Sequence, residues 1–166
     1  MQLTGKEIIS KGIVLGADEK CIQQQGVDLR VKKISAVNEK AGGFIPEDGK
    51  SIIPPTLEAY KYDKSYILSP GYYEVEFTQG CDVPRDATLH IKTRSSLVRC
   101  GAICHSGQFD GGFKTKNMGC FLHVILPISI EPNARIAQAL VFESNPVDDD
   151  KLYDGQWQGD KQRENK

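Results

Sequence analysis

The most informative stretch of this chain reads Thr93-Arg94-Ser95-Ser96-Leu97-Val98-Arg99, and it is followed closely by Asp110-Gly111-Gly112-Phe113. An arginine beside two serines can bind phosphate, because a guanidinium contacts two oxygens at once and the hydroxyls contact others. A plainer interpretation is a cap at a strand-to-helix junction, a position that serine often occupies. Asp110 is the only acidic residue between Asp86 and Glu131, so it is the candidate base that takes a proton from water. Phosphate binding together with a base is the minimum needed to cleave a phosphoanhydride.

The bulk composition indicates a single soluble globular domain. The chain has 166 residues, of which 39% are hydrophobic and 26% charged, with a net charge of −1. That charge gives no basic surplus for nucleic-acid binding, and no apolar run approaches the roughly 18 residues of a membrane span. The N-terminus does not resemble a signal peptide, and the five cysteines are an odd number without a framework spacing. We therefore expect reduced thiols and a cytoplasmic location.

A metal site is one interpretation of Cys100, Cys104 and His105, which lie close together in the sequence. Their spacing is not that of a repeated Cys-x2-Cys motif, and a structural zinc site needs a fourth ligand. Ordinary buried thiols are the favoured interpretation.

Hydrophobic periodicity predicts a mainly β domain over residues 1–143. Thr4 and Glu7 form a capping box that predicts one short helix, which ends at Gly12. Glycine and proline pairs predict turns and hairpins between residues 40 and 56. Strands are predicted at residues 27–31, 66–68, 72–77, 89–92, 120–126 and 136–142, and the apolar run 120–126 is typical of a strand covered on both faces. Many short strands with turns between them favour a sandwich or jelly roll.

The composition changes at Ser144, and residues 144–166 are predicted to form a flexible C-terminal arm. Tyr153 and the chain's only tryptophan, Trp157, interrupt this charged segment. One interpretation is that Trp157 docks on the body or on a neighbouring subunit. The other is that it stacks on the ring of a ligand when the arm closes.

Four segments in order resemble the motifs of the trimeric dUTPase and dCTP deaminase superfamily, and the resemblance is greatest to its archaeal dUTPase branch. They span nearly the whole chain from about residue 20 and read Gln24-Gln25-Gly26-Val27-Asp28-Leu29-Arg30-Val31, Thr93-Arg94-Ser95-Ser96-Leu97, Asp110-Gly111-Gly112-Phe113 and Ala134-Arg135-Ile136-Ala137-Gln138. The resemblance implies a distorted jelly-roll subunit with a short N-terminal helix. It also implies a homotrimer with three shared active sites, and Mg2+ bound with the triphosphate.

The resemblance assigns phosphate binding to Arg94 and Ser95, with Ser96 in support, and to Gln138 reaching over from another subunit. It assigns Asp28 the water around the metal, since Mg2+ usually keeps several waters. Without the resemblance, Gln138 is an exposed polar residue on a strand, and Asp28 is a charge at a turn or strand edge. Arg135 resembles the arginine that stands near this glutamine in the family, which implies a role in a structural ion pair.

By the same resemblance, Asp110 deprotonates the water that attacks the α-phosphorus of dUTP and releases pyrophosphate. The hairpin that holds the uracil ring is then the segment from Gly107 and Gln108 through Gly112 to Phe113. Gly111 and Gly112 allow close approach and unusual backbone angles. Phe113 stands where the family places an aromatic ring under the deoxyribose, and the resemblance makes Trp157 a base-stacking candidate.

The choice between the two enzymes of the superfamily depends on an acid–base group at the ring. Deaminases of this family carry a Glu on the strand after the hairpin, whereas residues 111–130 contain no acidic residue. His123 is the one substitute there, and a lone histidine in an apolar strand is more often structural. We therefore favour a dUTP diphosphatase over a dCTP deaminase. A non-catalytic nucleotide-binding regulator is a third hypothesis, and a nucleic-acid-binding β domain is disfavoured by the charge.

Two segments depart from the pattern of dUTPases. The segment 114–119 is longer than the usual turn after the aromatic residue and carries two lysines, Lys114 and Lys116. The arm lacks a glycine-rich, arginine-containing phosphate lid and looks more like a deaminase tail, which weakens the stacking role of Trp157.

Overall fold

The computed structural model describes residues 1–38, 40, 42–47, 52–55, 57–59, 63–155 and 157–160. Its helices are α1 (Gly5–Ser10) and α2 (Ser95–Arg99), with short 3-10 turns η1 (Glu19–Cys21), η2 (Asp149–Lys151) and η3 (Gln158–Asp160). Its strands are β1 (Val14–Leu15), β2 (Ile22–Gln23), β3 (Gly26–Val37), β4 (Leu57–Ala59), β5 (Tyr66–Leu68), β6 (Gly71–Phe77), β7 (Gly80–Asp82), β8 (Ala87–Thr93), β9 (Ala102–His105), β10 (Gln108–Phe109), β11 (Lys114–Thr115), β12 (Gly119–Val124), β13 (Ile128–Ile130) and β14 (Arg135–Glu143).

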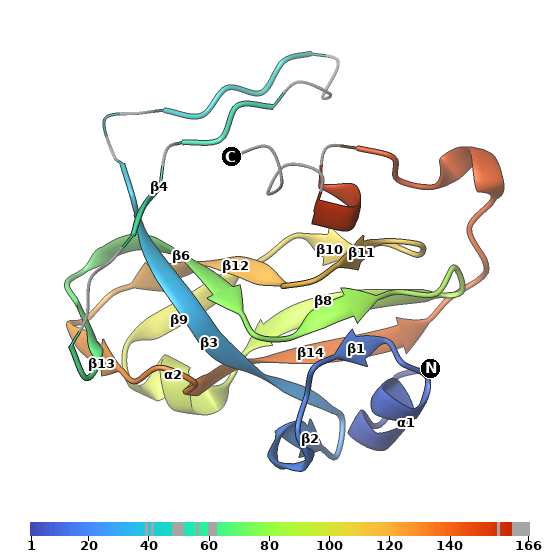
Figure 1. The fold of residues 1–166 in the computed structure, drawn as a ribbon, viewed down its shortest axis with the longest axis horizontal. Helices are drawn as coiled ribbons and strands as arrows, with labels where there is room; N and C mark the ends of the chain where they lie inside the picture. The colour runs from blue at the N-terminus through green and yellow to red at the C-terminus, as the bar shows by residue number, and fades with distance from the viewer. Residues whose placement is uncertain are drawn as a thin grey trace.

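The fold is built on one strongly curled sheet, shown in Figure 1. Within the described residues its strand order is β10-β8-β14-β3-β6-β12-β9, with β2 and β4 also paired to β3. Smaller sheets join β1, β7 and β11, and β13 with β5. All pairings are antiparallel, and the mainly β architecture predicted from periodicity is confirmed.

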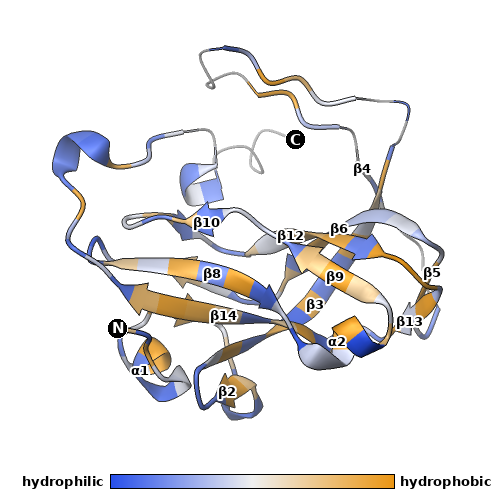
Figure 2. Cartoon of the chain, turned by 180° about the vertical axis from the view of Figure 1, so that it is seen from behind, coloured by the Kyte–Doolittle hydropathy of each residue, from blue (hydrophilic) through white to orange (hydrophobic). Residues whose placement is uncertain are grey.

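Strands β3 and β14 are the longest of the sheet, and apolar side chains alternate along the second half of β14. Ala137, Ala139 and Val141 of β14 are completely buried, while the residues between them lie toward the other face. Figure 2 shows how far apolar residues dominate β14. Strand β8 pairs along one side of β14 and β3 along the other, so this strand fixes their relative register.

Helix α1 begins where the capping box predicts. The Thr4 side chain accepts a hydrogen bond from the Glu7 N–H, and Glu7 accepts one from the Thr4 N–H at 2.8 Å. Ile8 is completely buried and Ile9 packs partly buried against the core, so two apolar side chains anchor the helix.

The expectation that residues 120–126 form a strand covered on both faces is wrong for the single chain. Strand β12 ends at Val124, and its side chains alternate between buried Cys120, Leu122 and Val124 and an open outer face. On that face Phe121 is 42% exposed, and His123 stacks on Tyr72 with ring centroids 4.5 Å apart.

The segment after β3 contains a hairpin, as its turn residues predict. Phe44 and Ile53 pair across it through two backbone hydrogen bonds of 2.8 and 3.0 Å. The predicted turn at Asp48 and Gly49 lies outside the described residues.

The five cysteines are free thiols, and only Cys100 among them is exposed. Cys104 lies on the buried face of β9 and His105 on its exposed face, so these neighbours do not point the same way. The described part of the chain holds no group of three His, Cys, Asp or Glu side chains suited to a metal ion. None of the helices in that part combines the length and apolar character of a membrane span.

Candidate functional site

The first half of the candidate site surrounds the carboxylate of Asp28 in β3, which is completely buried. The Arg94 Nε atom lies 3.3 Å from its Oδ1, and the Arg135 Nη1 atom lies 3.2 Å from its Oδ2. The Gln138 side-chain amide also donates to Oδ1, at 3.3 Å. Asp28 therefore holds two guanidinium groups and one amide in a fixed arrangement, and the ion pair expected for Arg135 is present.

Strand register explains why these residues meet. Gln138 of β14 lies directly opposite Asp28 of β3 on one side and Lys92 of β8 on the other. Residues opposite each other in antiparallel strands share one face, with Cβ atoms about 5 Å apart. The exposed Lys92 thus adds a cation on the face that carries Gln138 and Asp28, and sequence reasoning missed it because the register was unknown.

The two serines are on the surface and are not used to cap α2. Arg94 is the N-cap residue, and no side chain caps the helix. Ser95 and Ser96 are exposed in the first turn, next to the Arg94 side chain. Their hydroxyls can therefore bind a ligand that Arg94 also contacts.

Burial raises the pKa of the Asp28 carboxyl above its ordinary value, and the guanidinium groups of Arg94 and Arg135 oppose that rise. A buried carboxylate is stable only while its cationic partners remain in place. Asp28 therefore orients the side chains that are candidates for phosphate binding. Loss of either arginine would leave the buried negative charge of Asp28 with only one guanidinium partner.

The second half of the candidate site is the hairpin formed by β10 and β11. Asp110 lies in its turn, and the Gln108 amide donates to the Asp110 Oδ1 atom at 2.7 Å. Phe109 and Phe113 meet edge to face, with centroids 5.5 Å apart. The candidate base is thus held by an amide at the edge of an aromatic pair.

The predicted need for glycine at this turn has two separate causes. A Cβ on Gly111 would lie 2.7 Å from the Arg85 carbonyl oxygen, so a side chain there collides with backbone. Gly112 has a φ of +85°, in the region that residues with a side chain rarely adopt. Close approach and unusual backbone angles are therefore both present.

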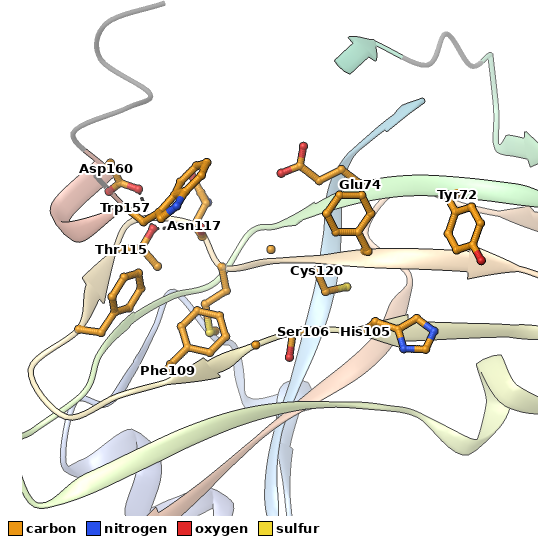
Figure 3. Close-up of a pocket in the computed structure, with 15 residues that line it drawn as sticks. Tyr72, Glu74, His105, Ser106, Phe109, Thr115, Asn117, Cys120, Trp157 and Asp160 are labelled. Carbon is orange, nitrogen blue, oxygen red and sulfur yellow. Dashed lines mark hydrogen bonds between the residues drawn. The ribbon is translucent and has the colours of Figure 1, made fainter. Parts of the chain in front are cut away.

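The two limbs of the hairpin separate and leave a cavity of about 790 Å3. Strands β9 and β12 pair directly, but β10 then pairs with β8 and β11 with β7. The cavity is drawn in Figure 3, and its lining includes Glu74, Ser106, Phe109, Thr115, Cys120 and Trp157. A smaller cavity of about 280 Å3 shares Gly107, Phe109, Phe113 and Trp157 with it and adds Gln108, Asp110 and Tyr153.

Glu74 is a lining residue that sequence reasoning missed. It comes from β6, where it lies opposite Phe121 of β12, and so it lies outside residues 111–130, which contain no acid. The alternation in residues 72–77 predicts a side chain on the outer face, but only the pairing of β6 with β12 brings it to the cavity.

The two halves of the site do not meet in one chain. Phe109 pairs with Leu89, which puts Asp110 level with the start of β8, whereas Arg94 follows the end of that strand. At about 3.3 Å per residue, Asp110 and Arg94 are about 20 Å apart. Figures 1 and 2 show α2 and β10 toward opposite ends of the fold.

Comparison with proteins of known sequence finds archaeal relatives over nearly the full chain. A protein of Methanocaldococcus jannaschii, named deoxyuridine 5'-triphosphate nucleotidohydrolase, is 32% identical over 152 residues, 90% of this chain and 95% of its own. Probable enzymes of the same name are 30% identical in Aeropyrum pernix, over 96% and 99% of the two chains, and 31% identical in Halobacterium salinarum, over 86% and 85%.

Comparison with solved structures supports the fold. The crystal structure of 2'-deoxycytidine 5'-triphosphate deaminase from Agrobacterium tumefaciens superposes with a TM-score of 0.63 at 13% identity. The match covers 84% of this chain but only 48% of that one, so this chain spans about half of the deaminase. The profile of a family described as dCTP deaminase-like matches residues 3–145. On this match and on its relatives of 30% identity or more, the chain belongs to the dCTP deaminase-like family, which confirms the resemblance seen in its motifs.

Proposed function

We propose that the chain is a dUTP diphosphatase that hydrolyses dUTP to dUMP and pyrophosphate. The observation that carries the proposal is Asp110, held by Gln108 beside the cavity between the parted limbs of the hairpin. A carboxylate so placed can take a proton from a water that attacks phosphorus. The names of the archaeal relatives point to the same reaction.

The base and sugar occupy the hairpin in this proposal. The limbs pair outward, β10 with β8 and β11 with β7, and the arm bonds the other edge of β11, so backbone groups of β10 are the ones that match the edge of uracil. Phe113 lies under the deoxyribose, and Trp157 closes the cavity from the arm. An aromatic ring packed against the sugar leaves no space for a 2'-hydroxyl.

The triphosphate binds to Arg94, Ser95, Ser96 and Gln138 of a second copy. One chain cannot supply both halves, because about 20 Å separates Asp110 from Arg94. A homotrimer can place the hairpin of one copy against α2 of the next. By symmetry, this brings the two halves of the site together at each of the three subunit contacts. The substrate then lies between two subunits, with its α-phosphorus near Asp110.

Mg2+ is assigned here to the triphosphate and not to Asp28. The Asp28 carboxylate is completely buried, and its oxygens already contact Arg94, Arg135 and Gln138, so it does not fit as a ligand or as a holder of metal-bound water. Mg2+ commonly binds through substrate phosphates and neutralises their charge. The chain's own contribution is to orient the phosphates and to activate water.

We place the enzyme in the cytoplasm, where its thiols would stay reduced. The five cysteines are free, and burial raises the pKa of Cys81 to about 12, which makes that thiol unreactive. Fractionation of cells that express the protein would test this location.

Deamination of dCTP is the second candidate, because Glu74 lines the same cavity. A carboxyl group beside the ring could carry the proton that loss of ammonia requires. This acid comes from β6 and not from the strand after the hairpin, so the absence of acids from residues 111–130 does not exclude the reaction by itself.

The deciding experiment gives the purified protein dUTP and dCTP separately, with Mg2+ or with EDTA, and measures pyrophosphate and ammonia. The proposal expects pyrophosphate from dUTP with Mg2+ and no ammonia from dCTP. Ammonia from dCTP, lost in the Glu74→Gln variant, would establish the deaminase. Tight dUTP binding without either product would point to a non-catalytic regulator and overturn the proposal.

A further inference from the structure

We propose that Asp160 is a positioning residue that latches the C-terminal arm onto β11 and so holds Trp157 at the mouth of the hairpin cavity. The closure itself follows from contacts within the chain. Its effect on turnover rests on the proposed function. Figure 3 shows Asp160 and Trp157 together on the arm, beside Thr115.

Asp160 is buried although it lies near the end of the described chain, with only 7% of its surface exposed. Its Oδ1 atom is 2.6 Å from the Thr115 hydroxyl oxygen, and its Oδ2 atom accepts the Lys116 backbone N–H at 2.7 Å. Both carboxylate oxygens are therefore used on one short segment of β11 and the residue after it. Hydrogen bonds to an ionised group are about twice as strong as neutral ones, and burial strengthens them further.

The C-terminal arm forms hydrogen bonds with backbone groups in and around β11, in addition to the pairing of β11 with β7. Strand β7 pairs with β11 through Cys81 and Thr115, which uses one edge of this two-residue strand. The Gln158 side chain accepts the Lys114 N–H at 2.9 Å and donates to the Gly112 carbonyl at 2.9 Å. Gln158 and Asp160 thus satisfy successive backbone groups between Gly112 and Lys116, as a neighbouring strand would.

The backbone turns sharply to make these contacts. Gly159 has a φ of +62° and Asp160 a φ of +63°, so two successive residues are left-handed. A residue other than glycine rarely adopts this conformation unless surrounding contacts hold it there. The two hydrogen bonds of the Asp160 carboxylate are contacts of that kind.

Trp157 is held between this latch and Tyr153. Its backbone N–H donates to the Tyr153 hydroxyl at 3.3 Å, and the Tyr153 ring lies 5.9 Å from that of Phe113. The indole lines both cavities beside the hairpin and is 41% exposed. Gln158 and Asp160 together anchor the C-terminal side of Trp157, so release of Asp160 would weaken that anchor and loosen this wall of the cavity.

The first test needs no substrate, because Trp157 is the only tryptophan in the 166-residue sequence. We expect acrylamide to quench its fluorescence more strongly in Asp160→Asn and Thr115→Val than in the unmodified protein. Thr115→Ser keeps the hydroxyl and should restore the low quenching. Asp150→Asn is the matched control, since Asp150 is on the arm but pairs only with the adjacent exposed Lys151 among the contacts described.

The second test separates the latch from the reaction. If the latch positions Trp157 over substrate, Asp160→Asn and Thr115→Val should raise KM for dUTP about tenfold and leave kcat within about twofold. Unchanged quenching in both variants, or a higher affinity for dUTP, would overturn the proposal. Absence of dUTP hydrolysis by the unmodified protein would instead refute the proposed function, and the quenching result would still decide the latch.

Discussion

Asp110 is the residue on which the proposed chemistry depends. Replacing it with Asn keeps its size and its contact with Gln108 but removes the group that accepts a proton. We expect Asp110→Asn to lower kcat for dUTP at least a hundredfold, because loss of a general base typically costs a factor of about a hundred to ten thousand. Binding of a non-hydrolysable dUTP analogue, measured by calorimetry, should change little. Equal loss of binding and turnover would make Asp110 a structural residue.

Lys92 is expected to bind phosphate, although no motif includes it. It lies opposite Gln138 on the same face of the sheet, and Gln138 contacts Asp28, the partner of both arginines. Lys92→Gln should raise KM for dUTP several-fold with little change in kcat, since one exposed charge contributes a modest and salt-sensitive attraction. Steady-state kinetics at low and high salt would measure this. Lys6→Gln on α1 is the control, and an equal effect there would indicate general charge, not a phosphate site.

For individual site residues, the sequence identifies those that belong to short motifs. It does not identify those that strand pairing brings to the site. Arg94, Gln138 and Asp110 could be named because short motifs carry them. Lys92 and Glu74 could not, because each reaches its half of the site only through the register of two strands distant in sequence. The resemblance assigns Asp28 to metal-bound water, but this carboxylate is completely buried and contacts Arg94, which precedes α2, and side chains of β14.

Among the secondary-structure elements, α1 depends on a local cap that can be tested alone. Thr4→Ala removes the side-chain acceptor for the Glu7 N–H and should lower the free energy of unfolding by about 1 kcal/mol, measured by urea denaturation. Thr4→Ser keeps the hydroxyl and should cost much less. An equal loss in both variants would show that the methyl group, not the cap, is what matters.

The same cap has a predictable pH dependence. Hydrogen bonds from the Thr4 backbone and side chain lower the pKa of Glu7. A carboxyl whose pKa is lowered by folding stabilises the fold above its unfolded pKa, and this contribution is lost as pH falls through the folded pKa. The difference in stability between the unmodified protein and Glu7→Gln should therefore shrink as pH falls below about 4. Urea denaturation across that range would measure it, and a constant difference would contradict the assignment.

Element prediction succeeded where the signal was local. The capping box, the period-two strands and the positive φ of Gly112 have causes within a few residues, and the structure contains them. The need for glycine at Gly111 comes instead from the distant Arg85 carbonyl. The separation of β10 from β11 had no such signal, because it results from competition with β8 and β7 for pairing. The apolar run 120–126 predicts a strand covered on both faces, but the outer face of β12 is open in the single chain, and no local signal in the run distinguishes the two cases.

On the surface of the molecule, exposed apolar side chains gather next to the half of the site that contains Arg94 and Asp28. Val98 of α2 is 51% exposed, and Ile125 and Leu126, which follow β12, are 48% and 59% exposed. Leu126 packs so closely on Gly101 that a Cβ there would lie 2.8 Å from it, which joins this segment to the end of α2. Apolar side chains gathered in this way typically form a protein interface. A neighbouring copy placed there would lie beside Arg94.

A site shared between copies predicts complementation between two inactive variants. Arg94→Gln removes the phosphate half and keeps the hairpin, whereas Asp110→Asn removes the base and keeps the phosphate half. Each variant alone should hydrolyse almost no dUTP. In the proposed trimer, random assembly from an equal mixture should regain about a quarter of the unmodified activity per site over the whole mixture, because half of the hairpins and half of the phosphate halves are intact and they meet independently. Trimers that contain both variants should regain about a third, because one of their three sites joins an intact hairpin to an intact phosphate half.

The mixture must be made by co-expression, with a different affinity tag on each variant, so that mixed assemblies are isolated through both tags. Folded variants mixed without exchange of chains provide the baseline, and circular dichroism checks that Arg94→Gln keeps the fold despite its contact with Asp28. Recovery in the doubly tagged fraction alone would mean that Asp110 and Arg94 act from different chains. Doubly tagged assemblies without activity would mean that each chain completes its own site, which would require the arm or the hairpin to cross the roughly 20 Å that separates the two halves.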